Sequence, residues 1–170
     1  GALLVCSWES AAAKVDQVYF LTEGDNKTMR VGVDGSSPET FLDVGAWPSC
    51  LAVDEASCSI FVAFRIMPWI QKVTLDGKLV SDFYKSPLEN ITARVESMFV
   101  DKVGRYLYWV QANSCIKRLP LDTNGTAEEF SWDNIYKPKE ISSIFVRNDG
   151  AGAPMIYLTS NELYNQVFAW

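Results

Sequence analysis

The chain repeats a pattern of short apolar segments, and this repeat constrains the fold more than any other feature of its 170 residues. The clearest copy has an apolar segment ending at Asp101, a turn through Gly104, and strand-length segments at residues 106–110, 116–121 and 128–132. One aromatic residue recurs at the same place in the second segment of each copy. These residues are Tyr19, Phe61, Tyr108 and Tyr157. A period of roughly 40 to 50 residues is typical of propellers and solenoids.

Each segment is rich in β-branched and aromatic residues and is bounded by Gly, Pro, Asn or Asp, whereas no stretch has the periodicity and caps of an amphipathic helix. A small four-stranded sheet cannot cover both of its own faces, so neighbouring sheets must pack face to face. The sequence therefore predicts an all-β chain, a β-propeller of four-stranded antiparallel blades. About three and a half blades are expected over residues 1–48, 49–95, 96–140 and 141–170, as one partial propeller over residues 1–170.

The first copy differs from the others in the connection between its first two strands. Residues 3–7 are predicted to form a strand, but the next clear strand begins only at Val18. We therefore expect a long connection over residues 8–17, with Ala11, Ala12 and Ala13 in a loop or a helical turn.

Charge and composition exclude several classes of function. The chain carries 15 Lys and Arg residues against 21 Asp and Glu residues, which argues against binding to a phosphate backbone. It contains no His, and it lacks zinc-type cysteine spacing, a P-loop and a nucleophile elbow. No apolar run is long enough to span a bilayer. We predict no enzyme activity, no cofactor, no nucleic-acid partner and no direct insertion into a membrane.

Two acidic residues, Asp54 and Asp101, recur at the end of the first strand of their copies. Carboxylates from several blades could bind structural calcium through oxygen ligands. Recurrence once per blade favours a structural role instead, in which the carboxylate caps turn amides or pairs with an arginine of the neighbouring blade such as Arg105. Asp34, Asp76 and Asp122 follow the third strand and are predicted to be turn residues.

Glycosylation motifs and cysteine usage favour an extracellular location. Three sequons, at Asn26, Asn90 and Asn124, all fall in predicted loops, where a glycan would be carried in water. The chain also has an even number of cysteines, which is compatible with disulfides in an oxidising compartment.

The order of strands in the repeat predicts that two of the four cysteines lie at one end of the blades and two at the other. Cys50 begins a first strand and Cys115 begins a third strand, at one end, whereas Cys6 and Cys58 lie near first-to-second-strand connections, at the other. We predict the disulfides Cys6–Cys58 and Cys50–Cys115, out of three possible pairings. Free buried thiols are the alternative.

An apolar cluster in two neighbouring connections is the candidate partner-binding site. The connection Arg65-Ile66-Met67-Pro68-Trp69 is unusually apolar, and Trp47 lies in a connection at the same end of the blade. Trp, Met and Arg are enriched in interface cores, and Trp and Arg in hot spots. We predict that Trp47, Arg65, Ile66, Met67 and Trp69 bind a partner. The alternative is that Trp47 and Trp69 pack between blades.

The third copy resembles the low-density-lipoprotein-receptor class B repeat, also called the YWTD repeat. That pattern has an apolar-Asp pair, a Gly-Arg turn and Tyr-Trp-Thr-Asp. Here Asp101, Gly104-Arg105 and Tyr108-Trp109 match it, while Val110 and Gln111 replace the Thr-Asp. The first and fourth copies keep an aromatic residue and Thr, in Phe20-Leu21-Thr22 and Tyr157-Leu158-Thr159.

The resemblance implies a six-bladed ring of the kind found in lipoprotein-receptor relatives, nidogen-like matrix proteins and the ectodomains of Sevenless/Ros receptor tyrosine kinases. The remaining blades would come from the same or another chain, or a smaller four-bladed ring would close. We therefore expect an extracellular module of a receptor or matrix protein that recognises a macromolecular ligand through its loop face. The alternatives are a spacer that packs on adjacent ectodomain modules and a propeller enzyme of the calcium-dependent hydrolase type.

Overall fold

The computed structural model describes residues 4–10, 13–22, 27–43, 47–67, 69–86, 94–111, 115–122, 125–130, 141–160 and 167–169, with side chains described only between residues 17 and 160. The chain forms two compact units, Gly1–Ile91 and Thr92–Trp170. Each unit is considered by itself. Within the described ranges there is no helix long and apolar enough to cross a membrane.

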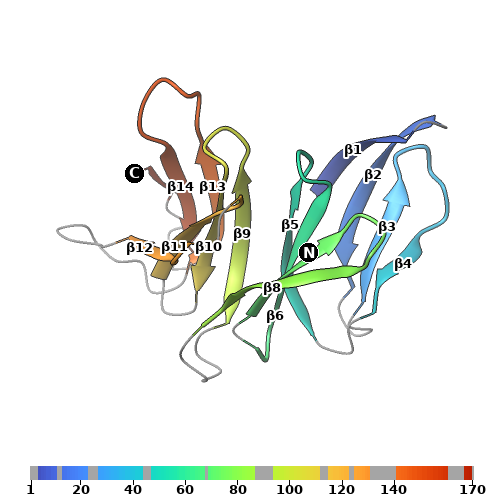
Figure 1. The fold of residues 1–170 in the computed structure, drawn as a ribbon, viewed down its shortest axis with the longest axis horizontal. Helices are drawn as coiled ribbons and strands as arrows, with labels where there is room; N and C mark the ends of the chain where they lie inside the picture. Colours follow the sequence, from blue (N-terminus) through green and yellow to red (C-terminus); the bar gives the residue numbers. More distant parts are fainter. Residues whose placement is uncertain are drawn as a thin grey trace. The chain divides into compact units, whose positions relative to one another are not determined.

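The first unit contains two four-stranded antiparallel sheets, each formed by strands that are consecutive in the chain (Figure 1). The strands of the first sheet are β1 (Leu4–Ser10), β2 (Ala13–Leu21), β3 (Thr28–Gly32) and β4 (Glu39–Leu42). Those of the second sheet are β5 (Pro48–Asp54), β6 (Ser59–Phe64), β7 (Trp69–Thr74) and β8 (Leu79–Lys85).

The second unit repeats this arrangement with a third and a fourth sheet. The third sheet has four strands, β9 (Val95–Asp101), β10 (Tyr106–Gln111), β11 (Cys115–Pro120) and β12 (Glu128–Phe130). The fourth has three described strands, β13 (Ile141–Arg147), β14 (Met155–Ser160) and β15 (Val167–Ala169). All pairings are antiparallel, so the predicted all-β fold of propeller blades is confirmed.

The core of each unit lies between its two sheets, and the two cores have the same construction. In the first unit, Tyr19 and Phe41 of the first sheet pack against aliphatic residues of the second, including Leu51 and Ile60. In the second unit, Tyr108 of the third sheet packs against aliphatic residues of the fourth, including Ile156. In each unit, a tyrosine of one sheet therefore packs against mostly aliphatic residues of the next sheet.

The backbone follows the sequence repeat down to individual turns. The turn after β5 ends at Cys58 and the turn after β9 ends at Arg105, and both residues have positive φ angles, 50° and 57°. The register matches as well, because Phe61 pairs with Ala52 in the second sheet and Tyr108 pairs with Phe99 in the third. Positions in different sheets can therefore be compared directly.

The long connection expected in the first copy is wrong. β1 and β2 continue as a paired hairpin beyond the repeated core, with Trp8 opposite Val15 and Ser10 opposite Ala13. The expectation failed because the short apolar run at the start of the copy marks only part of β1, and the more polar residues that follow it are also strand residues. Ala11 and Ala12 lie outside the described residues, whereas Ala13 begins β2.

Candidate partner-binding face

The predicted partner-binding residues lie in the second sheet, where the chain enters β5 and where β6 connects to β7. The backbone N–H of Arg65 donates a hydrogen bond of 2.7 Å to the carbonyl oxygen of Trp47, so the two connections are joined directly. Trp69 is the first residue of β7. Pro68 lies outside the described residues. The structure thus brings these residues to one end of a single sheet.

Apolar side chains at this end of the sheet are exposed to solvent. The exposed fractions are 52% for Trp47 and 51% for Ile66. Met67 lies between these residues and the interior, because it is partly buried against the core of the first unit. We refer to Trp47, Ile66, Met67 and Trp69 as the apolar patch. Trp47 and Ile66 are therefore the exposed part of the patch, and Met67 is the part that packs against the core.

Trp69 has a cation over its ring. The Lys85 ammonium lies 4.6 Å from the ring centroid, and Lys85 is also the cross-strand partner of Trp69. The same ammonium is 2.7 Å from the Asp82 carboxylate. Hydrogen bonds, first from Lys85 and then from Gln71, lower the pKa of Asp82. Lys85 is therefore fixed beside the patch as a charged rim.

This arrangement is suited to the burial of apolar side chains by a partner. A tryptophan and an isoleucine that are exposed above a rigid sheet can be buried by a partner, and aromatic anchors of this kind dominate interface energetics. Among the residues whose structure is described, no group of three or more His, Cys, Asp or Glu residues could hold a metal ion.

The recurring aspartates hold the turns between the first two strands of a sheet. Asp101 accepts hydrogen bonds from the N–H groups of Val103 and Gly104, at 3.0 and 2.9 Å, and from the Asn148 amide of the fourth sheet, at 2.8 Å. Asp54 accepts a bond of 2.6 Å from the Ser57 hydroxyl in the equivalent turn. These contacts agree with the structural role predicted for the carboxylates.

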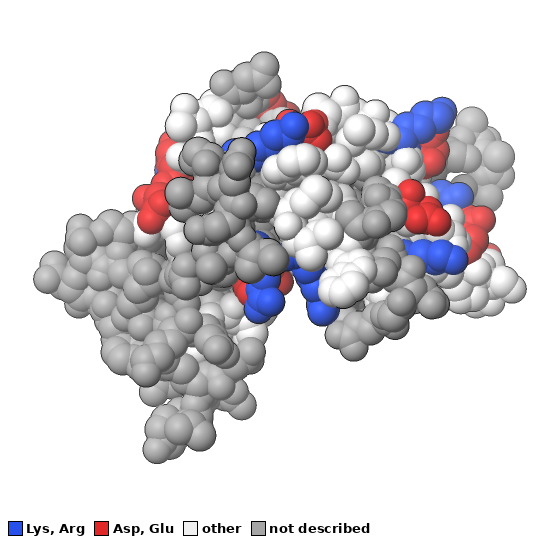
Figure 2. Space-filling view, turned by 90° about the horizontal axis from the view of Figure 1, so that it is seen from below, with Lys and Arg blue, Asp and Glu red and all other residues white. Residues whose placement is uncertain are grey.

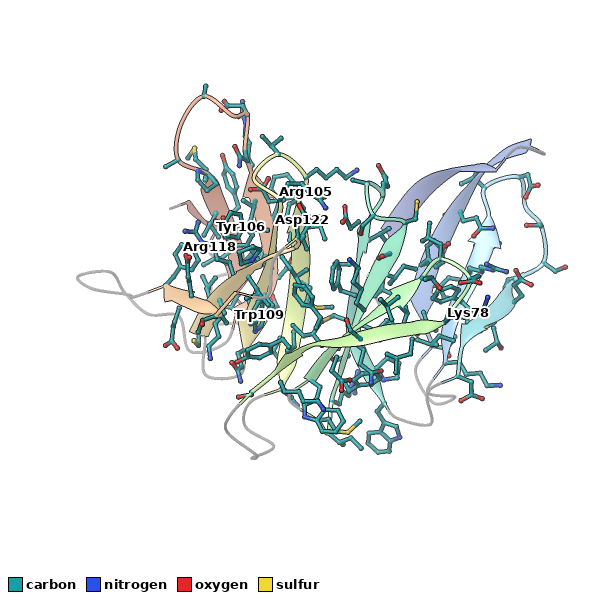
Figure 3. The ribbon with its side chains drawn as sticks, in the orientation of Figure 1. Lys78, Arg105, Tyr106, Trp109, Arg118 and Asp122 are labelled. Atoms are coloured by element: carbon teal, nitrogen blue, oxygen red, sulfur yellow. The ribbon has the colours of Figure 1, made fainter. Side chains whose placement is uncertain are left out.

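Two further side-chain contacts lie at these turns in the second unit, whereas the predicted pairing of an aspartate with an arginine of the neighbouring blade stays a prediction. Asn148, not an arginine, bridges to Asp101 from the next sheet. Arg105 holds Asp122 of its own sheet through two nitrogens, at 2.9 and 2.8 Å (Figure 3). Asp122 follows β11, so this pair ties two connections of the third sheet together.

Sequence reasoning missed a cation that lies opposite the repeated aromatic residue. Arg30 pairs with Tyr19, Lys72 with Phe61 and Arg118 with Tyr108.

Two of these cations, Arg30 and Arg118, lie beside both an aromatic ring and a carboxylate. The Arg118 guanidinium lies 4.6 Å from the ring centroid of Tyr106 and 2.7 Å from the Glu128 carboxylate (Figure 3). Arg30 pairs in the same way with Glu39, and Figure 2 shows basic and acidic side chains lying next to one another on the described surface. The signal in the sequence was a basic residue at a fixed place in the third segment of each of the first three copies.

Several predicted sites cannot be judged from the described residues. Asn26, Asn90 and Asn124 all lie outside them. Cys6 lies in β1 opposite Gln17, but its side chain is not described. The predicted disulfide Cys6–Cys58 therefore stays a prediction. Cys50 and Cys115 belong to different units, so the second predicted disulfide also stays a prediction. The Cys58 thiol is exposed and lies 3.7 Å from the Glu55 carbonyl oxygen.

Comparison with known proteins identifies the fold of the chain through one solved structure. No family model matches the chain, and no curated protein matches it in sequence. Among solved structures, it is similar to a chain of the crystal structure of a nidogen/laminin complex, with a TM-score of 0.68 and 18% sequence identity. That likeness shows the fold. It covers 85% of this chain and 52% of the other, so this chain spans about half the length of its structural relative.

Proposed function

We propose that the chain is part of an extracellular, six-bladed propeller of the YWTD type and that it binds a protein ligand through the apolar patch. The observation that carries this proposal is the exposure of Trp47 and Ile66 on a base that is anchored in the core by Met67. A large apolar surface that stays in water is favoured only if something else covers it. The similar chain comes from a complex between two proteins, which supports a binding role over an enzymatic one.

Two cations beside the apolar patch, Arg65 and Lys85, support a ligand that carries acidic residues beside an apolar anchor. Arg65 is exposed next to Ile66, and the Lys85 ammonium lies over the Trp69 ring. Cations at the edge of an interface act mainly on the association rate and on specificity. We therefore expect binding to weaken as the salt concentration rises, mostly through slower association.

The test uses the chain immobilised against a panel of purified matrix proteins and receptor ectodomains, laminin included. Trp47→Ala combined with Ile66→Ala should weaken binding to a positive panel member by at least about thirtyfold, because a single hot-spot truncation costs about 2 kcal/mol. Leu79→Ala is the matched control, since Leu79 is 60% exposed on β8 of the same sheet. Equal binding by the patch variant and the control would remove the apolar patch as the site. Failure to bind any panel member would favour the spacer.

We also propose the disulfide Cys6–Cys58, and the equivalence of the sheets supports it. Leu4 lies opposite Tyr19 as Phe99 lies opposite Tyr108, so Cys6 occupies the position of Asp101. Asp101 contacts the connection after the first strand of the following sheet. Cys58 lies in that connection in the second sheet. Peptide mapping under non-reducing conditions should yield a linked pair, and it should also report the proposed pair Cys50–Cys115 and glycan occupancy at Asn26, Asn90 and Asn124.

A further inference from the structure

A hydroxyl group is buried in the first sheet without a hydrogen-bond partner. Thr28 begins β3, which lies between β2 and β4 (Figure 1), and its cross-strand neighbours are Leu21 and Leu42. The Thr28 side chain is fully buried, and no donor or acceptor among the described residues reaches its Oγ1 atom. A buried hydroxyl that makes no hydrogen bond destabilises the folded state, so its presence needs an explanation.

The next two sheets have isoleucine at the position of Thr28. This position lies two residues before the cation that is opposite the repeated aromatic residue, and in the first three sheets it is occupied by Thr28, Ile70 and Ile116. Both isoleucines are fully buried. An apolar side chain therefore suits this place in a sheet, and packing does not account for the threonine.

Thr28 is also the third residue of the sequon Asn26-Lys27-Thr28. The enzyme that attaches N-linked glycans requires Ser or Thr at this third position, so isoleucine would abolish the motif. By contrast, Thr126 of the sequon at Asn124 is exposed. The hydroxyl that makes no hydrogen bond in the folded sheet is therefore the group that the glycosylation motif needs.

We propose that Asn26 is an N-glycan acceptor and that the Thr28 hydroxyl serves its recognition before β3 joins the first sheet. This inference rests on the extracellular location proposed above. The glycan comes from a lipid-linked pyrophosphate donor. A bond forms between the Asn26 amide nitrogen and the anomeric carbon of the first sugar, the bond from that carbon to the pyrophosphate oxygen breaks, and the amide nitrogen releases one proton.

Folding closes this motif to the enzyme. The N–H and the hydroxyl of Thr22 donate hydrogen bonds of 3.1 and 3.3 Å to the Lys27 carbonyl oxygen, so the middle residue of the sequon is fixed to the residue that follows β2. Thr28 is enclosed between two neighbouring strands. An enzyme reaches its hydroxyl only when β3 separates from the sheet. Transfer to Asn26 therefore precedes formation of the first sheet, whereas Thr126 stays accessible after folding.

Two measurements on the whole chain test the acceptor and the order of events. Peptide mapping of the chain secreted from animal cells should find a glycan at Asn26. The unglycosylated chain, purified from bacteria and shown by circular dichroism to be folded, is then incubated with purified oligosaccharyltransferase and its lipid-linked donor. Asn124 should be modified, and Asn26 should be modified at least about tenfold more slowly, because its recognition requires local opening of the sheet.

Thermal melting of the unglycosylated chain tests whether the hydroxyl is a burden in the folded state. Thr28→Val keeps the shape of the side chain and removes the hydroxyl, and it should raise the melting temperature by about 2–4 °C. Thr126→Val is the matched control. It also removes a sequon, but Thr126 is exposed, so the melting temperature should not change.

Four results would overturn the inference. A secreted chain with a glycan at Asn90 or Asn124 but none at Asn26 would reject the acceptor and leave the extracellular location intact. Equal rates at Asn26 and Asn124 in the folded chain would reject the order of events. A melting temperature that Thr28→Val does not raise would show that the hydroxyl serves the fold. The absence of glycans from all three sequons would overturn the inference together with the extracellular location, whereas binding by the apolar patch has its own test.

Discussion

At the scale of single residues, Gly104 lies where the turn after β9 has no room for a side chain. A Cβ atom at this position would be 2.5 Å from the Asp101 carboxylate and 2.9 Å from the Asn148 amide. Gly104→Ala should therefore break the hydrogen bonds between the third and fourth sheets and lower the free energy of unfolding by about 1–3 kcal/mol. Urea denaturation measures the change.

Gly152→Ala is the matched control for Gly104→Ala. A Cβ atom at Gly152 meets nothing within 4 Å, and Gly152 does not have a positive φ. The control should leave stability unchanged or raise it slightly. Equal effects of the two substitutions would show that the Asp101–Asn148 contact adds nothing to stability.

The Asp76 carboxylate in the turn after β7 is predicted to give the chain a small pH dependence in the acid range. Hydrogen bonds from Lys78 and then Thr74 lower its pKa from 3.8 to about 2. The folded state therefore gains stability from this carboxylate above the unfolded value of 3.8 and loses it as the pH falls through about 2. Asp76→Asn should flatten thermal stability across this window, by a small amount because the ion pair is exposed. Identical profiles for both proteins would contradict the assignment.

At the scale of strands, the arginines of β3 and β11 connect the inner and outer parts of their sheets. Arg118 contacts Tyr106 and Phe130 through its guanidinium, at 4.6 and 5.2 Å, and its ion pair with Glu128 reaches β12. Arg30 also donates a hydrogen bond of 3.3 Å to the Leu75 carbonyl oxygen of the second sheet. The cations therefore stabilise the pairing of the outermost strands, where few buried residues contribute.

Arg118→Met should cost about 1–2 kcal/mol of unfolding free energy, because it keeps the apolar stem and removes the cation and its hydrogen bonds. Hydrogen exchange should rise first in β12, the strand that Glu128 begins. Arg147→Met, an exposed substitution in the fourth sheet, should change neither quantity. Unchanged exchange in β12 would mean that strand pairing alone holds this edge.

The strands themselves were largely predictable from the sequence because the aromatic position recurs in every copy and fixes the register. The hairpin of β1 and β2 was not, since its extension adds polar residues that the repeat does not contain. The cation opposite each aromatic residue was not predicted either, because the spacing of residues along the chain does not show which residues face each other across two strands. Cross-strand partners become visible only when the register is known.

The candidate site was predictable in part for the same reason. The order of the strands places Trp47 and the connection after β6 at one end of a sheet, and the backbone contact between Arg65 and Trp47 agrees with this. The relation of Lys85 to Trp69 was not predicted, because it depends on a register shift within β7 and β8. The contact of Asn148 with Asp101 was not predicted either.

At the scale of the whole chain, the presence of two compact units with separate cores predicts separable effects of core mutations. Ile60→Ala in the first core and Leu158→Ala in the second should each cost about 2–5 kcal/mol. Hydrogen exchange should increase mainly in the unit that carries the substitution. A uniform increase across both units after either change would show that the chain unfolds as a single cooperative body.

Each described sheet is built from consecutive strands, and each described core joins consecutive sheets, so few contacts must wait for distant parts of the sequence. Chains of this kind close only short loops as they fold. During synthesis, a finished sheet can therefore receive the next one as soon as roughly 40 further residues have emerged. The outer strands completed along the way carry Glu39, Asp82 and Glu128, and charges on an open strand edge discourage pairing with other nascent chains.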